Sequence, residues 1–178
     1  EDGVGGYVFS ADAPGHVWLV SAPWPADVAR ALRMAATKRA ERPEGEPIYS
    51  MPAAELFGSM VVPTAAREAG MPGHTVIAIG DCQPIDHAIA AERSRNAQIQ
   101  AELRSGLPKW DQWLSVSVPR ELNMDADRLS HPELLADVVR DATAAGLVVH
   151  VAPISRRLWQ MARDAIEAGA GALEAEEP

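Results

Sequence analysis

The sequence predicts an α/β fold in which a mixed β-sheet is flanked by helices. Short runs rich in Val, Ile, Trp and Tyr have the composition of strands, and the longer stretches between them carry apolar residues at helical spacing. The length of 178 residues suits one hydrophobic core. An apolar fraction of 47% and a charged fraction of 23% are ordinary for a globular protein and exclude wholesale disorder.

Residues 6–24 are predicted to form a β-hairpin. Two runs rich in Val and aromatic residues flank Ala13-Pro14-Gly15, which is a turn signal. This pattern places Asp12 at the end of the first strand, next to the turn. On these residues alone, Asp12 is either a turn-forming residue or a functional carboxylate.

Two helices are predicted after the hairpin. Residues 25–42 have apolar side chains at helical spacing and a proline at the start. A loop over residues 42–47 leads to a second helix over residues 51–70, with Glu55 near its start. Pro63 is expected to kink or interrupt this second helix, because proline lacks a backbone donor and clashes with the preceding turn.

The middle of the chain predicts two further strands. The continuous apolar run over residues 74–81 is typical of a strand buried on both faces, with Asp81 at its end. Residues 84–106 are predicted to be helical, with a break near 94–96. Residues 113–119 alternate apolar and polar side chains, which predicts a strand with one face in water.

Residues 132–168 predict a C-terminal helix-strand-helix extension packed on the same domain as the core, residues 1–131. The strand is expected over residues 147–153. Gly169 suits the end of the last helix. Residues 169–178 are expected to be an acidic tail.

Charge and cysteine usage limit the classes of function. The net charge of −9 argues against a protein that simply coats nucleic acid, but does not exclude an enzyme that acts on it. No apolar run approaches the roughly 20 residues needed to cross a bilayer, so no membrane partner is expected. The lone Cys82 fits a reducing intracellular compartment, cytoplasm or nucleus. Because the chain begins at Glu1 and a strand follows closely, we expect a segment of a longer protein.

Asp81 is the first indication of a functional site. A carboxylate at the end of a buried strand is costly unless a cation or a partner compensates its charge. Mg²⁺ prefers hard oxygen ligands, and two such ions can hold both the attacking and the leaving oxygen of a phosphodiester. Spacing alone does not identify the acids that converge with Asp81.

Five motifs follow one another along residues 7–131: FSADAPG, PAAELFGSM, IGDCQPIDHAI, ERSRNAQIQAELR and VPRELNMDADRLS. Their order and spacing resemble the ribonuclease H domain that follows the reverse transcriptase in retrotransposons. The last motif is the most specific, because it matches a Pro followed by the family's Asn-x-x-Ala-Asp-x-Leu-Ser. The resemblance implies a ribonuclease H-like fold.

The resemblance also implies a metal-dependent endonuclease that cuts the RNA strand of RNA–DNA hybrids. Asp125 competes with Asp127 for the last ligand position, and the spacing from Asn123 selects Asp127. Two of the candidate acids also have a purely structural interpretation. Glu55 could be an ordinary acid in the first turn of a helix, where the helix dipole favours it, and Asp81 could cap the helix that follows. The acids expected to bind two Mg²⁺ ions, or Mn²⁺ in their place, and to carry catalysis are Asp12, Glu55, Asp81 and Asp127.

The expected partners are an RNA–DNA hybrid and the polymerase part of the same polyprotein. A hybrid is recognised by its groove shape and its 2′-hydroxyls rather than by sequence. The structural alternative for the arginines is that they lie on a solvent-exposed face of a helix and contact no nucleic acid. The residues expected to contact nucleic acid are Arg93, Arg95, Asn96, Arg120 and Asn123.

Three positions depart from the family pattern. Ser117 stands where the family commonly has a histidine that helps the leaving group or product release. Arg120 stands in place of a Gly, and Cys82 in place of an Asn. A catalytically silent ribonuclease H-like scaffold in a larger reverse transcriptase or host assembly is therefore the alternative function. A nuclease or transposase of the same fold that acts on DNA is a third.

Overall fold

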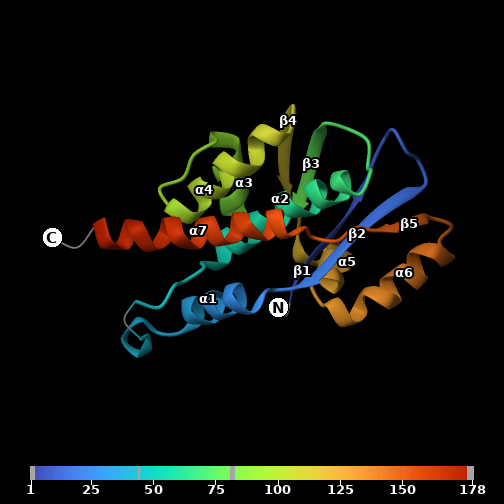
Figure 1. The fold of residues 1–178 in the computed structure, drawn as a ribbon. Coiled ribbons are helices and arrows are strands. Elements are labelled where there is room, and N and C mark those ends of the chain that lie inside the picture. The colour runs from blue at the N-terminus through green and yellow to red at the C-terminus, as the bar shows by residue number, and fades with distance from the viewer. Residues whose placement is uncertain (1–2, 44, 81–82, 176–178) are drawn as a thin grey trace.

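The computed structural model describes residues 3–43, 45–80 and 83–175, which form a mixed α/β structure with two small sheets (Figure 1). Helices lie beside and between these sheets. This arrangement confirms the predicted α/β class. No helix in the described ranges is long and apolar enough to span a membrane.

The first sheet has the strand order β1-β2-β5. β1 (Gly3–Phe9) pairs antiparallel with β2 (His16–Pro23), so the predicted hairpin is confirmed. β5 (Val148–Val151) pairs parallel with the other edge of β2. The C-terminal extension therefore supplies a strand to the N-terminal sheet.

The second sheet contains β3 (Thr75–Gly80) and β4 (Gln112–Ser117), which pair in parallel. Its inner face packs on a small cluster that includes Val76, Trp110 and Ala66. Parallel strands need a crossover, and here the two helices between β3 and β4 provide it.

The expectation that β3 is buried on both faces is wrong. Ile77 and Ile79 are 64% and 62% exposed, since helices cover the other face only. β4 has one exposed face, as expected, but this face carries Leu114 and Val116 rather than polar side chains. An apolar run indicates that a strand can be buried, and it does not indicate what covers it.

The helix α2 (Met51–Glu68) forms the centre of the core, with Leu56, Phe57, Met60 and Val61 fully buried. The expected interruption at Pro63 does not occur, because α2 continues as one helix to Glu68. Burial of its neighbours along the helix compensates for the backbone hydrogen bond that proline cannot make. The remaining helices are α1 (Ala26–Ala36), α3 (Gln83–Ala91), α4 (Ala97–Gly106), α5 (Met124–Leu129), α6 (Leu135–Ala144) and α7 (Arg156–Ala175), with single 3₁₀ turns at Arg39–Glu41, Leu107–Lys109, Arg120–Leu122 and Pro132–Leu134.

The predicted break near residues 94–96 is confirmed by the separate helices α3 and α4. The last helix, however, does not end near Gly169, and residues 169–175 are helical. A Cβ added at Gly169 would lie 2.6 Å from Nε2 of Gln98. This glycine therefore allows α7 to approach α4 closely, which is a packing role rather than a helix-ending role.

Candidate functional site

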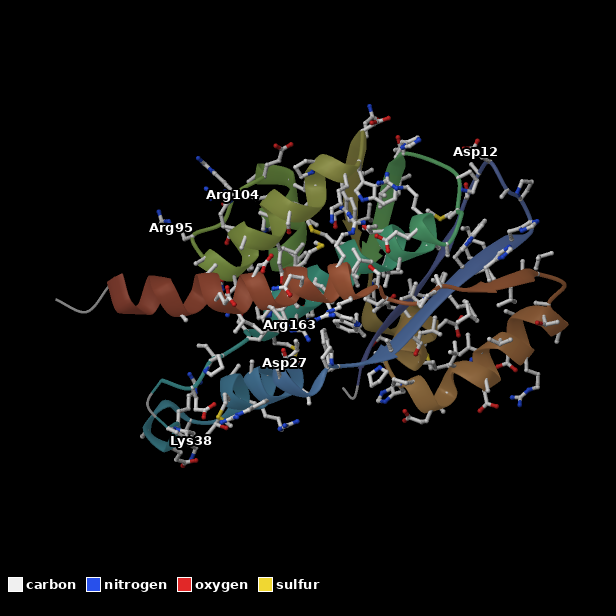
Figure 2. All side chains as sticks on the ribbon, viewed as in Figure 1. Asp12, Asp27, Lys38, Arg95, Arg104 and Arg163 are labelled. Atoms are coloured by element: carbon white, nitrogen blue, oxygen red, sulfur yellow. The ribbon has the colours of Figure 1, made fainter. Side chains whose placement is uncertain are left out.

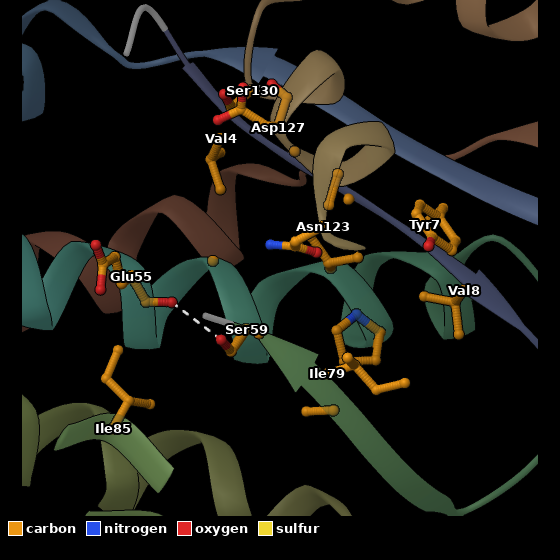
Figure 3. A pocket seen from close by; sticks show the side chains of 18 of the residues that line it. Val4, Tyr7, Val8, Glu55, Ser59, Ile79, Ile85, Asn123, Asp127 and Ser130 are labelled. Atoms are coloured by element: carbon orange, nitrogen blue, oxygen red, sulfur yellow. Dashed lines mark hydrogen bonds between the residues drawn. The ribbon is translucent and has the colours of Figure 1, made fainter. Parts of the chain in front are cut away.

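A cavity of about 630 Å³ lies between the two sheets. Every residue of β1 lines it on one side, and Val76–Gly80 of β3 line it on the other. Helices α2 and α5 complete the walls, as Figure 3 shows. Four separate parts of the chain thus meet at this cavity.

The α2 wall presents one helical face to the cavity. Ala54, Glu55, Gly58, Ser59 and Val62 recur three to four residues apart, which is the spacing of neighbours on a helix surface. Gly58 is tightly placed, because a Cβ there would lie 3.3 Å from a methyl group of Val4 on β1. The small residues of this face keep the cavity open.

The α5 wall is held against β1 by a glycine. A Cβ at Gly5 would clash with the carbonyl oxygen of Leu129, so α5 packs directly on the strand backbone. Ser21 of β2 adds a hydrogen bond of 2.6 Å from its hydroxyl to the same oxygen. These contacts fix the position of Asp127, which lies two residues earlier in α5.

Two of the four predicted carboxylates line the cavity, each from a different wall. Glu55 lines it from α2 and Asp127 from α5, and Asn123 lies with Asp127 on the same wall (Figure 3). Gly80, the last residue of β3, also lines the cavity. Asp81 follows Gly80 in the sequence and, like Cys82, lies outside the described residues.

Asp12 does not line this cavity. It is exposed in the turn between β1 and β2, where its backbone N–H donates to the hydroxyl of Ser10 at 3.3 Å. The Ser10 hydroxyl in turn donates to the carbonyl of Pro72 at 2.9 Å, which ties the hairpin turn to the loop before β3. The position of Asp12 matches the turn-forming alternative. The structure therefore separates Asp12 from the cavity that Glu55 and Asp127 share.

The structure distinguishes Asp127 from Asp125. The Asp125 side chain is 69% exposed, does not line the cavity, and forms an ion pair of 3.5 Å with Arg128. Asp127 is partly buried and lines the cavity. The spacing from Asn123 in the closing motif thus selected the acid that reaches the cavity.

The residues predicted to contact nucleic acid also fall into two groups, those that line the cavity and those that do not. Asn96 caps α4, because its side-chain oxygen accepts hydrogen bonds from the backbone N–H groups of Gln98 and Ile99. Arg93 and Arg95 are exposed in the connection from α3 to α4 and do not line the cavity. Figure 2 shows Arg95 at the opposite end of the molecule from Asp12.

Asn123 is the one predicted nucleic-acid contact that the structure places at the cavity, among those with described side chains. The side chains of Arg120 and of Ser117, which occupies the histidine position, lie outside the described part of the structure.

The charge at the cavity is negative. Among its described lining residues, the side chains that carry charge are Glu55 and Asp127. Carboxylate oxygens are the ligands that Mg²⁺ prefers, so each of these two side chains offers oxygen atoms to a cation in the cavity. Within the described residues no group of three or more His, Cys, Asp and Glu side chains is arranged to hold a metal ion.

Sequence reasoning missed the role of the glycines in β1. Gly3, Gly5 and Gly6 lie in a strand, where glycine indicates close approach of another backbone. Gly5 meets the end of α5 and Gly6 approaches Val62 of α2, so the strand is narrow where both helices contact it. The spacing of these glycines was the one feature of the sequence that could have indicated how closely the walls of the cavity approach β1.

Comparisons with known proteins give no independent support. The chain matches no protein-family model, no curated protein and no solved structure. The ribonuclease H resemblance therefore remains a prediction from five sequence motifs. The functional assignment depends on where the structure places the residues of those motifs.

Proposed function

We propose that this chain is a metal-dependent endonuclease that hydrolyses the RNA strand of RNA–DNA hybrids, as the ribonuclease H-type domain of a reverse transcriptase polyprotein. One observation carries the proposal. Glu55 and Asp127 belong to different motifs that are distant in sequence, and both line the same cavity. Most of the 25 acids of the chain are not among the described residues that line this cavity, which supports the choice of these two motif residues.

The donor set at the cavity fits a hard divalent cation. Glu55 and Asp127 offer carboxylate oxygens from two walls, and Asp81 directly follows the cavity-lining Gly80 in the sequence. When bound, Mg²⁺ would lower the pKa of a water molecule and stabilise the departing 3′ oxygen. We place Glu55, Asp81 and Asp127 in this role and leave out Asp12.

The other polar groups of the cavity suit a phosphodiester substrate. Asn123 has an amide that can donate to a phosphate oxygen, and Ser130 on the same wall has a hydroxyl group. The Ser130 hydroxyl donates to the Asp127 carbonyl at 2.7 Å, which stabilises the end of α5. Asn123 is therefore the side chain we assign to positioning the substrate.

Matched pairs of substitutions test the proposal. Asp127→Asn and Glu55→Gln should each reduce Mg²⁺-dependent cleavage of a labelled hybrid by about 100-fold or more, because each removes a carboxylate that would hold the metal ion that stabilises the developing charge. The controls Asp125→Asn and Asp12→Asn should remain within about twofold of the parent. Equal losses in Asp127→Asn and Asp125→Asn, or no cleavage by the parent in Mg²⁺ or Mn²⁺, would refute the assignment.

A substrate panel tests the specificity. The parent protein should cut the RNA strand of a hybrid and leave duplex DNA and single-stranded RNA intact. Cleavage of duplex DNA would instead favour a DNA nuclease or transposase of the same kind.

A catalytically silent interaction module is the second candidate, and the exposed face of the β3–β4 sheet favours it. Ile77, Ile79, Leu114 and Val116 form an aliphatic surface of the type that binds partners. Calorimetric titration with Mg²⁺ and Mn²⁺ separates the candidates, because a silent module with no metal site would show no binding heat.

A further inference from the structure

The two sheets have strand edges that pair with no other strand in the described part of the chain. β1 pairs with β2 along one edge, and β3 pairs with β4 along one edge. In each strand, the opposite edge carries backbone N–H and C=O groups. Such groups form a template for a further strand.

These two open edges border the same cavity. Successive side chains of a strand point to opposite faces, so a cavity that borders on every residue of a strand runs along its edge. All of β1 and five consecutive residues of β3, Val76–Gly80, line the cavity. The cavity therefore runs between the two edges.

The directions of the strands define what fits between them. β1 and β3 run in opposite directions along the cavity (Figure 3). A strand between them would be antiparallel to one edge and parallel to the other, and both patterns occur in mixed sheets. β1 has seven residues and β3 has six, so a segment of about six residues would match both edges.

The walls favour an extended backbone with apolar side chains. On the α2 side the occupant would meet the small or apolar Ala54, Gly58 and Val62. The polar side chains of Glu55 and Ser59 lie on the same helical face. Near the open edges, Phe9 and Ile79 are 56% and 62% exposed. An extended polypeptide also presents N–H and C=O groups alternately to its two sides, which is what two facing edges require.

We propose that the cavity binds an extended segment of another polypeptide as a β-strand, which joins the two sheets into one. The segment has about six residues, apolar side chains toward α2 and no proline at its centre. The proposal is independent of nuclease activity, and it concerns the same cavity. Binding would bury the open edges and bring the β3–β4 sheet into a continuous sheet with β1.

Backbone methylation of a probe peptide provides the sharpest test. The probe is a capped heptapeptide that alternates Val and Thr, and two analogues carry N-methyl groups at the odd or at the even positions. Alternate N–H groups of a strand face opposite sides, so a strand between two edges should lose at least tenfold in affinity in both analogues. If only one analogue is weakened, the peptide adds to a single edge, and the proposal is wrong.

Substitutions in the cavity provide a matched control. The Ser59 hydroxyl donates to the Glu55 carbonyl of its own helix at 3.1 Å, and Ser59→Phe would place a ring in the cavity. Thr143, an exposed residue of α6, makes the same kind of bond to the Val139 carbonyl at 2.8 Å. Ser59→Phe should weaken peptide binding at least tenfold, whereas Thr143→Phe should leave it unchanged, with circular dichroism confirming that both variants fold. Equal affinity in the two variants would overturn the proposal.

Hydrogen exchange locates the bound peptide. With saturating heptapeptide, amides in both β1 and β3 should exchange more slowly. Protection of one strand alone, protection of neither, or no binding at millimolar peptide would each overturn the proposal. No step of this test uses cleavage activity, so its result is separate from that of the nuclease test.

Discussion

The two sheets contain similar apolar side chains, but they differ in coverage. In the β1-β2-β5 sheet, Val17 and Leu19 are buried against Leu129 and Val138 of the C-terminal helices. The opposite face carries Val20, which is buried in the main core with α2. The β3–β4 sheet packs on one face only, and its other face exposes four aliphatic side chains.

This difference shows that coverage, rather than strand composition, separates the two sheets. Full burial of one aliphatic side chain contributes about 1.5–3 kcal/mol. The β1-β2-β5 sheet gains this contribution on both faces because α5 and α6 pack over one face and α2 over the other. The β3–β4 sheet gains it on one face, which leaves surface available for a partner.

The largest expected effect is at the covered face. Leu129 is fully buried between α5 and the first sheet, so Leu129→Ala should lower the free energy of unfolding by about 2–5 kcal/mol. Leu122→Ala is the matched control, because Leu122 is 73% exposed and should cost little. Urea denaturation measures both. Similar losses in the two variants would mean that coverage does not distinguish these regions.

The next largest effect on stability is expected in the core between the helices, where Glu102 is buried. Tyr49 donates a hydrogen bond to the fully buried Glu102, and burial raises the pKa of the Glu102 carboxyl well above its usual range despite this bond. Its Oε2 atom has no hydrogen-bond partner among the described residues. At neutral pH the folded state must either keep this carboxyl protonated or bury its charge, and each unit of raised pKa corresponds to about 1.4 kcal/mol, so the uncharged Glu102→Gln should stabilise the protein by about 1 kcal/mol or more.

The pH dependence of this effect has a definite sign. Because the folded-state pKa is raised, the contribution of Glu102 is fully present below the ordinary Glu pKa of about 4.3 and is lost as the pH rises through the folded-state value. The Tm advantage of Glu102→Gln should therefore grow between about pH 4 and pH 8. A constant difference across that range would show that Glu102 does not titrate as a buried acid.

A smaller effect is expected from a surface ion pair beside the same core. The hydrogen bond from Arg163 lowers the pKa of Asp27, and the Nε–Oδ2 distance is 2.6 Å. The Asp27 side chain is 56% exposed, so Asp27→Asn should cost less than about 1 kcal/mol at pH 7. The cost should be fully present above the ordinary Asp pKa of about 3.9 and should vanish as the pH falls through the lower folded-state pKa. A large loss that persists in high salt would contradict the view that burial dominates this region.

The smallest effect is expected at the uncovered face. Ile77→Thr keeps the β-branched shape at a position that is 64% exposed, so the free energy of unfolding should change by no more than about 0.5 kcal/mol. Solubility should rise because the aliphatic surface becomes smaller. If the substitution destabilises the isolated chain by several kcal/mol, Ile77 is covered in solution and the comparison of the two sheets fails.

Much of the local structure could be predicted from the sequence. The turn signal after Asp12 predicted the hairpin, and helical spacing predicted α2 and its neighbours, because these patterns depend on residues close in sequence. The exposure of Ile77 could not be predicted, since it depends on the absence of a covering helix among the described residues rather than on β3 itself. Gly169 was misassigned for the same reason, because its contact with Gln98 is distant in sequence.

The candidate site could be predicted only in part. The motif spacing identified Glu55 and Asp127, which share a cavity. It also chose Asp12, whose neighbours form a turn, because a short Asp-Ala-Pro match carries little information about where a strand edge will lie. The pairing of β5 with β2 had no local signal either, since strand partners are set by packing across the whole chain.

The pairing of β2 with β5 also determines when the first sheet can be completed. His16–Leu19 pair with Val148–Val151, so a loop of about 130 residues must close, and contacts of such long sequence separation form slowly. During synthesis, β2 leaves the ribosome long before β5 is made. The outer edge of β2 therefore stays open while the roughly 130 residues between the two strands are made, and the sheet reaches its final width only after β5 has emerged.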